Sequence, residues 1–200
     1  VGEEPFSISV GLMLPHQPFV ARREDYELYA GRMTMPRTPQ PFSGDLHPHI
    51  AQWRRATGIV EVPDEEILRA RTAYWALVTR MDLMIGEILE ALRRNDLADN
   101  TLIVYSSDHG EQVGEHGLWW KQTFYEHSVK VPTILSWPGR LPEGKRLHQV
   151  VSSLDLNTTL LDALDAPALP NSRGRSVLPL LEPTRSGQGV TWENVAFSEF

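Results

Sequence analysis

An apolar run rich in β-branched and aromatic residues, from Thr101 to Tyr105, predicts a buried strand. The run is followed by polar residues that include Asp108 and His109, so side chains able to bind a metal ion stand where the strand ends and the chain turns. In open α/β sheets, ligands bind at the carboxyl ends of strands. The run therefore favours an α/β fold with a binding site directly after it.

A long helix is predicted just before this strand, from Asp64 to Arg94. Acidic residues open the segment and Arg93-Arg94 closes it, which complements the helix dipole at both ends. Its apolar residues recur at helical spacing: Ala70, Tyr74, Leu77, Met81, Ile85, Ile88 and Leu92. The order of helix and then strand is that of an α/β unit.

Further strands are predicted in the rest of the chain, at residues 6–14, 131–136, 150–153 and 195–200. The runs 6–14 and 101–105 are almost continuously apolar, as expected for a parallel sheet covered on both faces. A second helix is predicted from Leu156 to Leu164 with Asp155 as its cap.

Two segments are predicted to be irregular. Residues 32–62 carry several prolines and read as a long excursion without regular structure, and residues 167–183 read as loop.

Composition restricts the class of protein. The formal net charge of −7 disfavours general attraction to nucleic acid or anionic lipid, so neither a nucleic-acid nor a membrane partner is expected. The absence of cysteine excludes disulfides, Cys-ligated zinc and an encoded Cys nucleophile within this chain. No apolar run reaches the roughly 20 residues that span a bilayer. We therefore expect a soluble protein. The absence of cysteine does not fix the compartment; a cytoplasmic location is favoured, with a signal peptide left open because the N-terminal Val1-Gly2-Glu3-Glu4 looks like a cut end.

Asp108 and His109 are the candidate metal ligands. A carboxylate suits a hard divalent cation, and a ring nitrogen can complete its coordination sphere. Both side chains can reach one ion only if the backbone turns, which Gly110 permits. The alternative is a turn-forming Asp-His-Gly without a metal, and spacing alone leaves the two interpretations open.

Lys121 and His16 are the candidate anion-binding residues. A Lys ammonium is a compact point charge suited to a sulfate or phosphate oxygen, and an imidazole titrates near neutral pH, which suits acid–base work. The alternatives are an ordinary surface Lys beside two tryptophans and an ordinary polar His held between Pro15 and Pro18.

Two motifs together resemble the sulfatase family, a branch of the alkaline phosphatase superfamily, and in particular arylsulfatases and choline sulfatases. They are the Asp-His-Gly…Gly-Glu-His-Gly…Lys run, which ends at Lys121, and the Pro-His-x-Pro-Phe segment around His16. The resemblance implies an alkaline-phosphatase-like sheet with helices on both faces, incomplete in this chain. It also implies a divalent metal on Asp108 and His109, most of all Ca²⁺, with Mn²⁺ and Mg²⁺ as alternatives. Lys121 and His16 would bind the sulfate, and His16 would also assist the leaving group.

The resemblance covers only the middle and later part of a sulfatase. Residues 1–200 are therefore interpreted as a fragment of the catalytic domain, with 155–200 as the start of the C-terminal region. The family's nucleophile is a formylglycine made from Cys or Ser in a Cys/Ser-x-Pro-x-Arg motif. Ser136 to Arg140 match this pattern, but they follow the Pro-His-x-Pro-Phe segment instead of preceding it and lack the Thr-Gly that should come next. We interpret them as a turn, so the nucleophile and two further metal carboxylates are expected outside this chain.

The resemblance implies a sulfuric ester hydrolase that acts on a small-molecule sulfate ester, with the fragment inactive by itself. A phosphonate monoester or phosphodiester hydrolase of the same superfamily is the alternative, and a non-catalytic binding module that keeps the fold is a second. The fragment is expected to expose an apolar face and to self-associate or require its missing N-terminal half.

Other residues of the motifs are assigned no catalytic role. Glu115 and His116 are expected to be structural, and His127 has no predicted role. His47 and His49 are either substrate-facing or ordinary loop residues. Of Trp119 and Trp120, one is expected in the core and one at a pocket wall.

Overall fold

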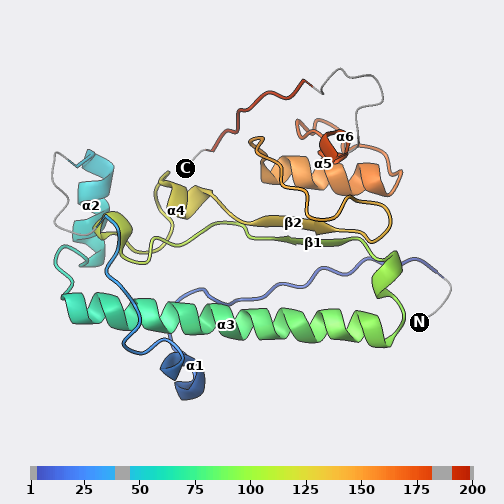
Figure 1. The fold of residues 1–200 in the computed structure, drawn as a ribbon. Helices are drawn as coiled ribbons and strands as arrows, with labels where there is room; N and C mark the ends of the chain where they lie inside the picture. Colours follow the sequence, from blue (N-terminus) through green and yellow to red (C-terminus); the bar gives the residue numbers. More distant parts are fainter. Residues whose placement is uncertain (1–3, 39–45, 182–190, 199–200) are drawn as a thin grey trace. The chain divides into compact units, whose positions relative to one another are not determined.

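The computed structural model describes residues 4–38, 46–181 and 191–198 (Figure 1). The chain divides into two compact units. The first contains Val1–Ala98 and His109–Val131, and the second contains Asp99–Asp108 and Pro132–Phe200. Each unit has its own secondary structure and is described by itself.

The first unit is built on the long helix α3 (Asp64–Arg94), whose bounds agree with the prediction. Its acidic first turn and basic last turn are in place, so the dipole argument accounts for both ends. The short helix α1 (Arg23–Glu27) packs against α3 (Figure 1). The guanidinium of Arg80 on α3 donates to both carboxylate oxygens of the buried Asp25, each at 2.9 Å. This bidentate ion pair joins the two helices.

The core of this unit joins α3 to helix α2 (Pro48–Thr57) and to the loop that follows residue 110. Its buried members are Ile50, Ile59, Ile67, Val113, Leu118 and Trp119. The predicted irregular excursion 32–62 is therefore wrong in part, because α2 lies within it, while residues 39–45 lie outside the described residues. The local signals for α2 are His47 as N-cap, Pro48 in the first turn and a left-handed Gly58 at the C-cap.

The second unit holds strands β1 (Ile103–Ser106) and β2 (Thr133–Ser136), which form a two-stranded sheet. The pair is antiparallel, with Val104 opposite Leu135 and Tyr105 opposite Ile134. The expected parallel arrangement is thus wrong for the sheet that the described residues form. An apolar strand sequence indicates burial, but it does not state which direction its neighbour runs.

Helix α5 (Ser153–Ala163) corresponds to the predicted second helix but begins three residues before the predicted Leu156. Its N-cap is Ser152, and Asp155, the third residue of the helix, completes a capping box with it. The Asp155 carboxylate accepts the Ser152 backbone N–H at 2.8 Å. The cap prediction was therefore wrong by three residues, although it named a residue that does stabilise this helix end.

Three of the predicted strands are absent from the described residues. Residues 6–14 carry no strand, and residue 153, the end of the predicted 150–153 strand, already begins α5. Residues 195–198 carry no strand either, and 199–200 lie outside the description. The predicted loop 167–183 contains the short helix α6 (Leu178–Leu181), with 182 and 183 outside the description. An isolated extended segment becomes a strand only beside a partner, and within the described residues 6–14 has none.

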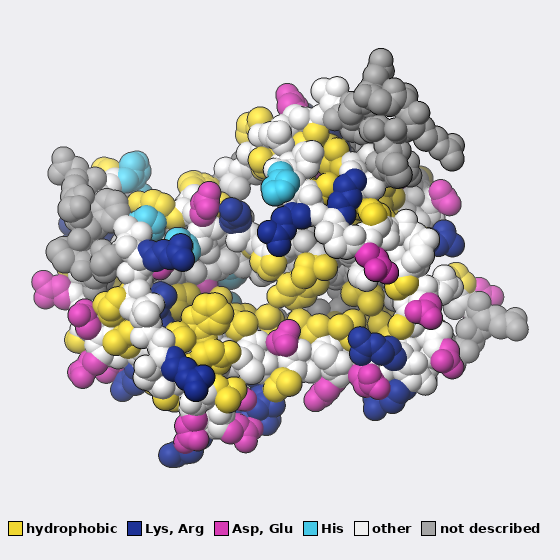
Figure 2. All heavy atoms as spheres, viewed as in Figure 1, with side chains coloured by type: hydrophobic (Ala, Val, Ile, Leu, Met, Phe, Trp, Pro, Cys, Tyr) yellow, Lys and Arg dark blue, Asp and Glu magenta, His cyan; other side chains and the backbone are white. Residues whose placement is uncertain are grey.

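Apolar side chains reach the surface in both units, as the yellow patches among charged residues in Figure 2 illustrate. In the 6–14 segment, Ile8 is 74% exposed and Met13 is 76% exposed, which is unusual for a run predicted to be buried. No helix in the described part of the chain combines the length and apolar character that a membrane span requires.

Candidate functional site

His16 has a defined tautomer in the turn between Pro15 and Pro18. Its Nδ1 lies 2.8 Å from the Gln17 carbonyl oxygen. Because a carbonyl oxygen can only accept, Nδ1 carries the proton and donates it. The other ring nitrogen, Nε2, is then the basic one and is available as an acceptor.

Lys121 meets His16 at this nitrogen. The Lys121 ammonium Nζ lies 3.0 Å from His16 Nε2, so the ammonium donates to the ring. Both side chains are partly buried. These two head groups are in contact although 105 positions of sequence separate them, and that they bind one anion stays a prediction.

His109 lies next to His16, with ring centroids 6.3 Å apart. Its Nδ1 is 2.8 Å from the Gly110 carbonyl oxygen, so Nδ1 carries a proton and donates it. Metal-ligating His residues usually donate one ring N–H to a carbonyl oxygen, a carboxylate or water, and His109 makes such a hydrogen bond. The first unit therefore brings together three of the predicted site residues: His16, His109 and Lys121.

Asp108 follows β1 by two residues, at the strand end where it was predicted. The Ser107 hydroxyl donates to its carboxylate at 3.4 Å. Asp108 is the last residue of its segment in the second unit, and His109 opens a segment of the first unit. That both side chains point to one ion stays a prediction.

The described residues do not form a metal centre by themselves. Among residues 4–38, 46–181 and 191–198, no three His, Asp or Glu side chains are grouped as a metal ion would require. Ca²⁺ takes six to eight ligands, so an Asp and a His are a small part of any such sphere. The donor types fit a divalent cation, but the described set is too small to hold one.

Gly110 is required by a close approach of two chain segments. Its N–H donates to the Ser128 carbonyl at 2.7 Å, and a Cβ at this position would lie 2.0 Å from the His127 carbonyl oxygen. This explains the glycine of the Asp-His-Gly sequence in a way that the turn argument did not.

Glu111 is a site residue that the sequence analysis missed. Its carboxylate accepts the backbone N–H groups of Trp120 and Val113. Burial raises the pKa of Glu111, and the two hydrogen bonds, together with attraction by Lys121 and His109, oppose that rise. Its position directly after Asp-His-Gly was the signal that would have found it.

Glu115 has the structural role expected for it. Its two carboxylate oxygens accept the backbone N–H groups of Arg37 at 3.0 Å and Thr38 at 2.9 Å. Burial by itself raises the pKa of Glu115, but these hydrogen bonds and the nearby His127 and Arg71 outweigh it, so the pKa lies below its ordinary value. Glu115 therefore ties segment 37–38 to the loop after Gly110.

The remaining candidates are placed as follows. His116 stacks on Tyr125 with ring centroids 4.0 Å apart, and burial, aided by the charge of His127, lowers the His116 pKa. His47 caps α2 through its Nδ1, and the exposed ring of His49 lies 3.4 Å from the Gln122 carbonyl.

The two tryptophans differ in their surroundings. Trp119 is a buried member of the core, as expected of one of the pair. Trp120 is half-buried and packs edge-on against Trp53 with ring centroids 6.0 Å apart. Whether Trp120 walls a substrate pocket stays a prediction.

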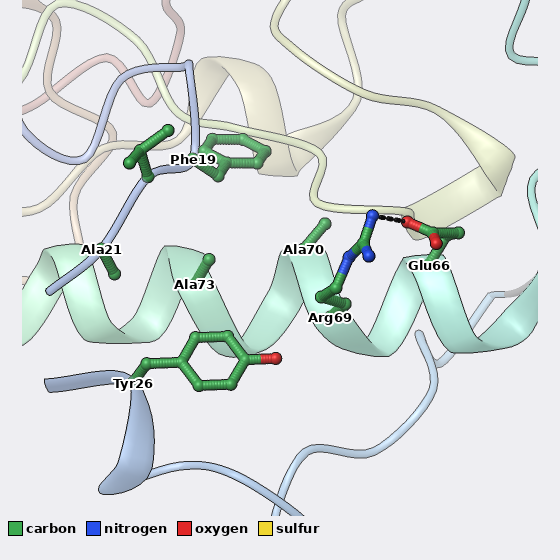
Figure 3. Close-up of a pocket in the computed structure, with 8 residues that line it drawn as sticks. Phe19, Ala21, Tyr26, Glu66, Arg69, Ala70 and Ala73 are labelled. Atoms are coloured by element: carbon green, nitrogen blue, oxygen red, sulfur yellow. Dashed lines mark hydrogen bonds and ion pairs between the residues drawn. The ribbon is translucent and has the colours of Figure 1, made fainter. Parts of the chain in front are cut away.

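A pocket of about 420 Å³ lies between the segment 19–26 and α3 (Figure 3). Figure 3 shows Phe19 and Ala70 facing it and the Arg69–Glu66 ion pair at its side. Neither His16 nor Lys121 lines it. This pocket is therefore distinct from the predicted anion site.

Comparison with known proteins finds similarity to sulfatases. The sulfatase family model matches residues 1–166. The choline-sulfatase of Rhizobium meliloti (strain 1021) is 32% identical over 98% of this chain and 39% of its own length. The human arylsulfatase K (Homo sapiens) is 34% identical over 90% of this chain and 36% of its own. The chain thus spans well under half the length of these curated relatives.

A solved structure of another protein also resembles this chain. The phosphonate monoester hydrolase of Silicibacter pomeroyi superposes with a TM-score of 0.76 at 29% identity, over 86% of this chain and 37% of that one. The match supports the α/β, alkaline-phosphatase-like class, which the mixed helix and sheet of the described residues also show. With the family model matched over most of the chain and the His16, His109 and Lys121 side chains gathered in one unit, the chain belongs to the sulfatase family.

Proposed function

We propose that the full-length protein hydrolyses sulfate esters of small molecules. The observation that carries the proposal is the 3.0 Å contact between Lys121 Nζ and His16 Nε2. The Lys121 ammonium supplies a local positive charge beside the His16 ring in a chain whose net charge is −7. Such a site suits an anionic headgroup with several acceptor oxygens.

Lys121 would bind a sulfate oxygen and stabilise the negative charge that develops in the transition state. His16 would act at the bridging oxygen. Its Nδ1 is held protonated by the Gln17 carbonyl, so any further proton is taken up at Nε2. From Nε2 that proton can pass to the leaving oxygen, which makes His16 the general acid.

The nucleophile is proposed to be a formylglycine outside this chain, and Ser136 is not proposed for the role. Ser136 is the last residue of β2. The sequence after it forms a turn, in which Arg140 N–H and Leu141 N–H both donate to the Trp137 carbonyl. A turn at this point supports the interpretation that the Ser-x-Pro-x-Arg match is incidental.

A divalent cation is proposed to bind Asp108 and His109, with Ca²⁺ favoured by the carboxylate and Mn²⁺ or Mg²⁺ as alternatives. The metal would supply Lewis-acid charge stabilisation. The hydrogen bond from His109 Nδ1 to the Gly110 carbonyl, of the kind that metal-ligating His residues make, supports the choice of His109. Its remaining ligands are proposed to lie in the part of the protein that this chain does not contain, so residues 1–200 represent a fragment of a catalytic domain, and 155–200 the start of its C-terminal region.

A phosphonate monoester or phosphodiester hydrolase is the alternative function. The observation that favours it is the structural match to the Silicibacter pomeroyi phosphonate monoester hydrolase. Both substrate classes present oxygens to a cation, so the His16–Lys121 contact does not separate them.

The test compares the full-length protein on matched aryl esters of sulfate, phosphate and methylphosphonate, with a divalent cation supplied. A kcat/KM highest for the sulfate ester supports the proposal, and one highest for the phosphonate supports the alternative. No turnover of any ester, together with binding of the sulfate ester, would instead indicate a non-catalytic binding module. A cytoplasmic location stays a prediction, which the distribution of the tagged full-length protein in cells would test.

A further inference from the structure

The loop that leads to Lys121 has an unusual backbone. Three of its residues other than glycine have left-handed φ values: Val113 at 47°, His116 at 56° and Trp120 at 66°. Residues with a Cβ rarely adopt this conformation, and a β-branched residue such as Val almost never does. Strain of this kind persists only where surrounding contacts hold it in place, and it concentrates at functional sites.

The Glu111 carboxylate supplies such contacts at two of the three positions. Its Oε1 accepts the N–H of Val113 at 3.3 Å and also the N–H of Trp120. Both hydrogen bonds therefore go to residues with left-handed backbone. A carboxylate that accepts two backbone N–H groups forms charge-assisted bonds, which are stronger than neutral ones.

Trp120 is held from both sides. Its N–H donates to Glu111, and its carbonyl accepts the Gln112 N–H at 3.0 Å. The next residue is Lys121, so the orientation of the Trp120 backbone sets the direction in which the Lys121 side chain leaves the loop. That side chain ends 3.0 Å from His16 Nε2.

We infer that Glu111 is a positioning residue for Lys121: by binding the left-handed N–H groups of Val113 and Trp120, it holds the Lys121 ammonium against His16. The claim that Lys121, held in this way, binds a substrate anion rests on the proposed function. The claim that Glu111 positions Lys121 by hydrogen bonding is independent of the proposed function.

The chain offers a matched control in Glu115. Glu115 is a buried carboxylate of the same loop and, like Glu111, accepts two backbone N–H groups, but these belong to Arg37 and Thr38 outside the loop. Glu115→Gln keeps one acceptor oxygen and removes the charge. It therefore reports what a comparable change does to the loop when the Trp120 N–H is left alone.

Three variants of Glu111 separate hydrogen bonding from charge. Glu111→Gln keeps an acceptor oxygen at the same reach and loses the charge. Glu111→Asp keeps the charge and withdraws the acceptor by one methylene. Glu111→Ala removes both. If Glu111 positions Lys121 through the Trp120 N–H, the contact between Lys121 and His16 should be kept in Glu111→Gln, as in the parent. It should be lost in Glu111→Asp, as in Glu111→Ala.

The first measurement needs no substrate. The ¹⁵N resonances of the His16 ring in the full-length protein report the acceptor state of Nε2. We expect the parent, Glu111→Gln and Glu115→Gln to show the Nδ1–H tautomer with a hydrogen-bonded Nε2, and Glu111→Asp and Glu111→Ala to lose that Nε2 signature. A His16 spectrum unchanged in Glu111→Asp, or lost equally in Glu115→Gln, would overturn the inference. If Glu111→Ala does not fold, the comparison of Asp with Gln decides.

The second measurement uses activity in a double-mutant cycle. Loss of a residue that orients a metal ligand typically costs about 10- to 100-fold, and we expect a loss of the same order in kcat/KM for Glu111→Ala. In a Lys121→Ala background the same substitution should cost less than about twofold, because the two residues act as one unit. Full additivity would mean a general structural role and would contradict the inference. If the parent itself turns over no sulfate ester, the proposed function fails, and the NMR result still tests the role of Glu111.

Discussion

The Lys121 ammonium donates to Nε2 of His16 across 3.0 Å, although the two residues are 105 positions apart in the sequence. The Gln17 carbonyl fixes the proton on the opposite nitrogen of the ring. The contact thus places one ammonium beside one neutral imidazole. The positive charge of this pair would attract an anion.

Removal of the ammonium should abolish most of the proposed activity. We expect Lys121→Ala to lower kcat by about 100- to 1,000-fold, the usual cost of losing one group that stabilises transition-state charge. Steady-state kinetics of the full-length protein on an aryl sulfate measure this. Lys130→Ala is the charge-matched control, because its side chain is 75% exposed and forms an ion pair with Glu126, one turn earlier. Equal losses in both variants would contradict the assignment.

Gly110 should tolerate no side chain. A Cβ there would lie 2.0 Å from a backbone oxygen, so we expect Gly110→Ala to destabilise the protein by several kcal/mol or prevent folding. Gly86→Ala is the control, since Gly86 lies within α3, where a Cβ would meet nothing within 4 Å beyond the helix's own backbone, and should stabilise by about 0.5–1 kcal/mol. Chemical denaturation of both variants measures the difference. A Gly110→Ala protein as stable as the parent would show that the close approach is absent.

The first unit should lose stability in acid. The pKa of Glu115 is lowered by its environment, so its contribution is present above the unfolded-state pKa and is lost as the pH falls through the folded-state pKa. The free energy of unfolding, measured against pH, should therefore fall below about pH 4.3. Glu115→Gln should flatten this part of the curve. If the free energy of unfolding falls as steeply with decreasing pH in Glu115→Gln as in the parent, other carboxylates cause the loss of stability in acid.

His116 should add a second decline to the pH dependence of the free energy of unfolding, at higher pH than that of Glu115, because the folded-state pKa of His116 is also lowered. The neutral ring is favoured in the folded state, so stability should decline as the pH falls from about 6.5 through the folded-state pKa. His116→Asn removes the titration and suits the left-handed backbone at this position, where φ is 56°. The decline should disappear in this variant, and its persistence would exclude His116 as the cause.

The second unit should depend on a buried hydroxyl. Thr159 is fully buried; its Oγ1 accepts the Val177 N–H at 3.0 Å and donates to the Asp155 carbonyl at 2.6 Å. Thr159→Val leaves that N–H without a partner and should cost about 1–3 kcal/mol. Thr158→Val is the adjacent control, because Thr158 is only half-buried and its hydroxyl bonds the Leu154 carbonyl at the surface, and it should stay within about 0.5 kcal/mol of the parent. Equal effects of the two substitutions in denaturation experiments would contradict this account of Thr159.

Much of the local structure followed from residue order. The acidic start, apolar spacing and basic end of Asp64–Arg94 predicted α3 with its observed bounds, because helix signals act within a few turns of the chain. The apolar run before Asp108 predicted the position of β1 within two residues. The family motifs also named His16, His109 and Lys121, which the first unit gathers.

Other features depend on contacts between segments remote in sequence, and only the tertiary structure decided them. The antiparallel direction of β2, the unpaired state of 6–14 among the described residues and the need for glycine at 110 all depend on what lies alongside. The same holds for Glu111, whose importance lies in the backbone N–H of Trp120, nine positions away. Periodicity and capping report the local free energy of the chain, whereas pairing and close approach are set by the neighbour that folding brings to each segment.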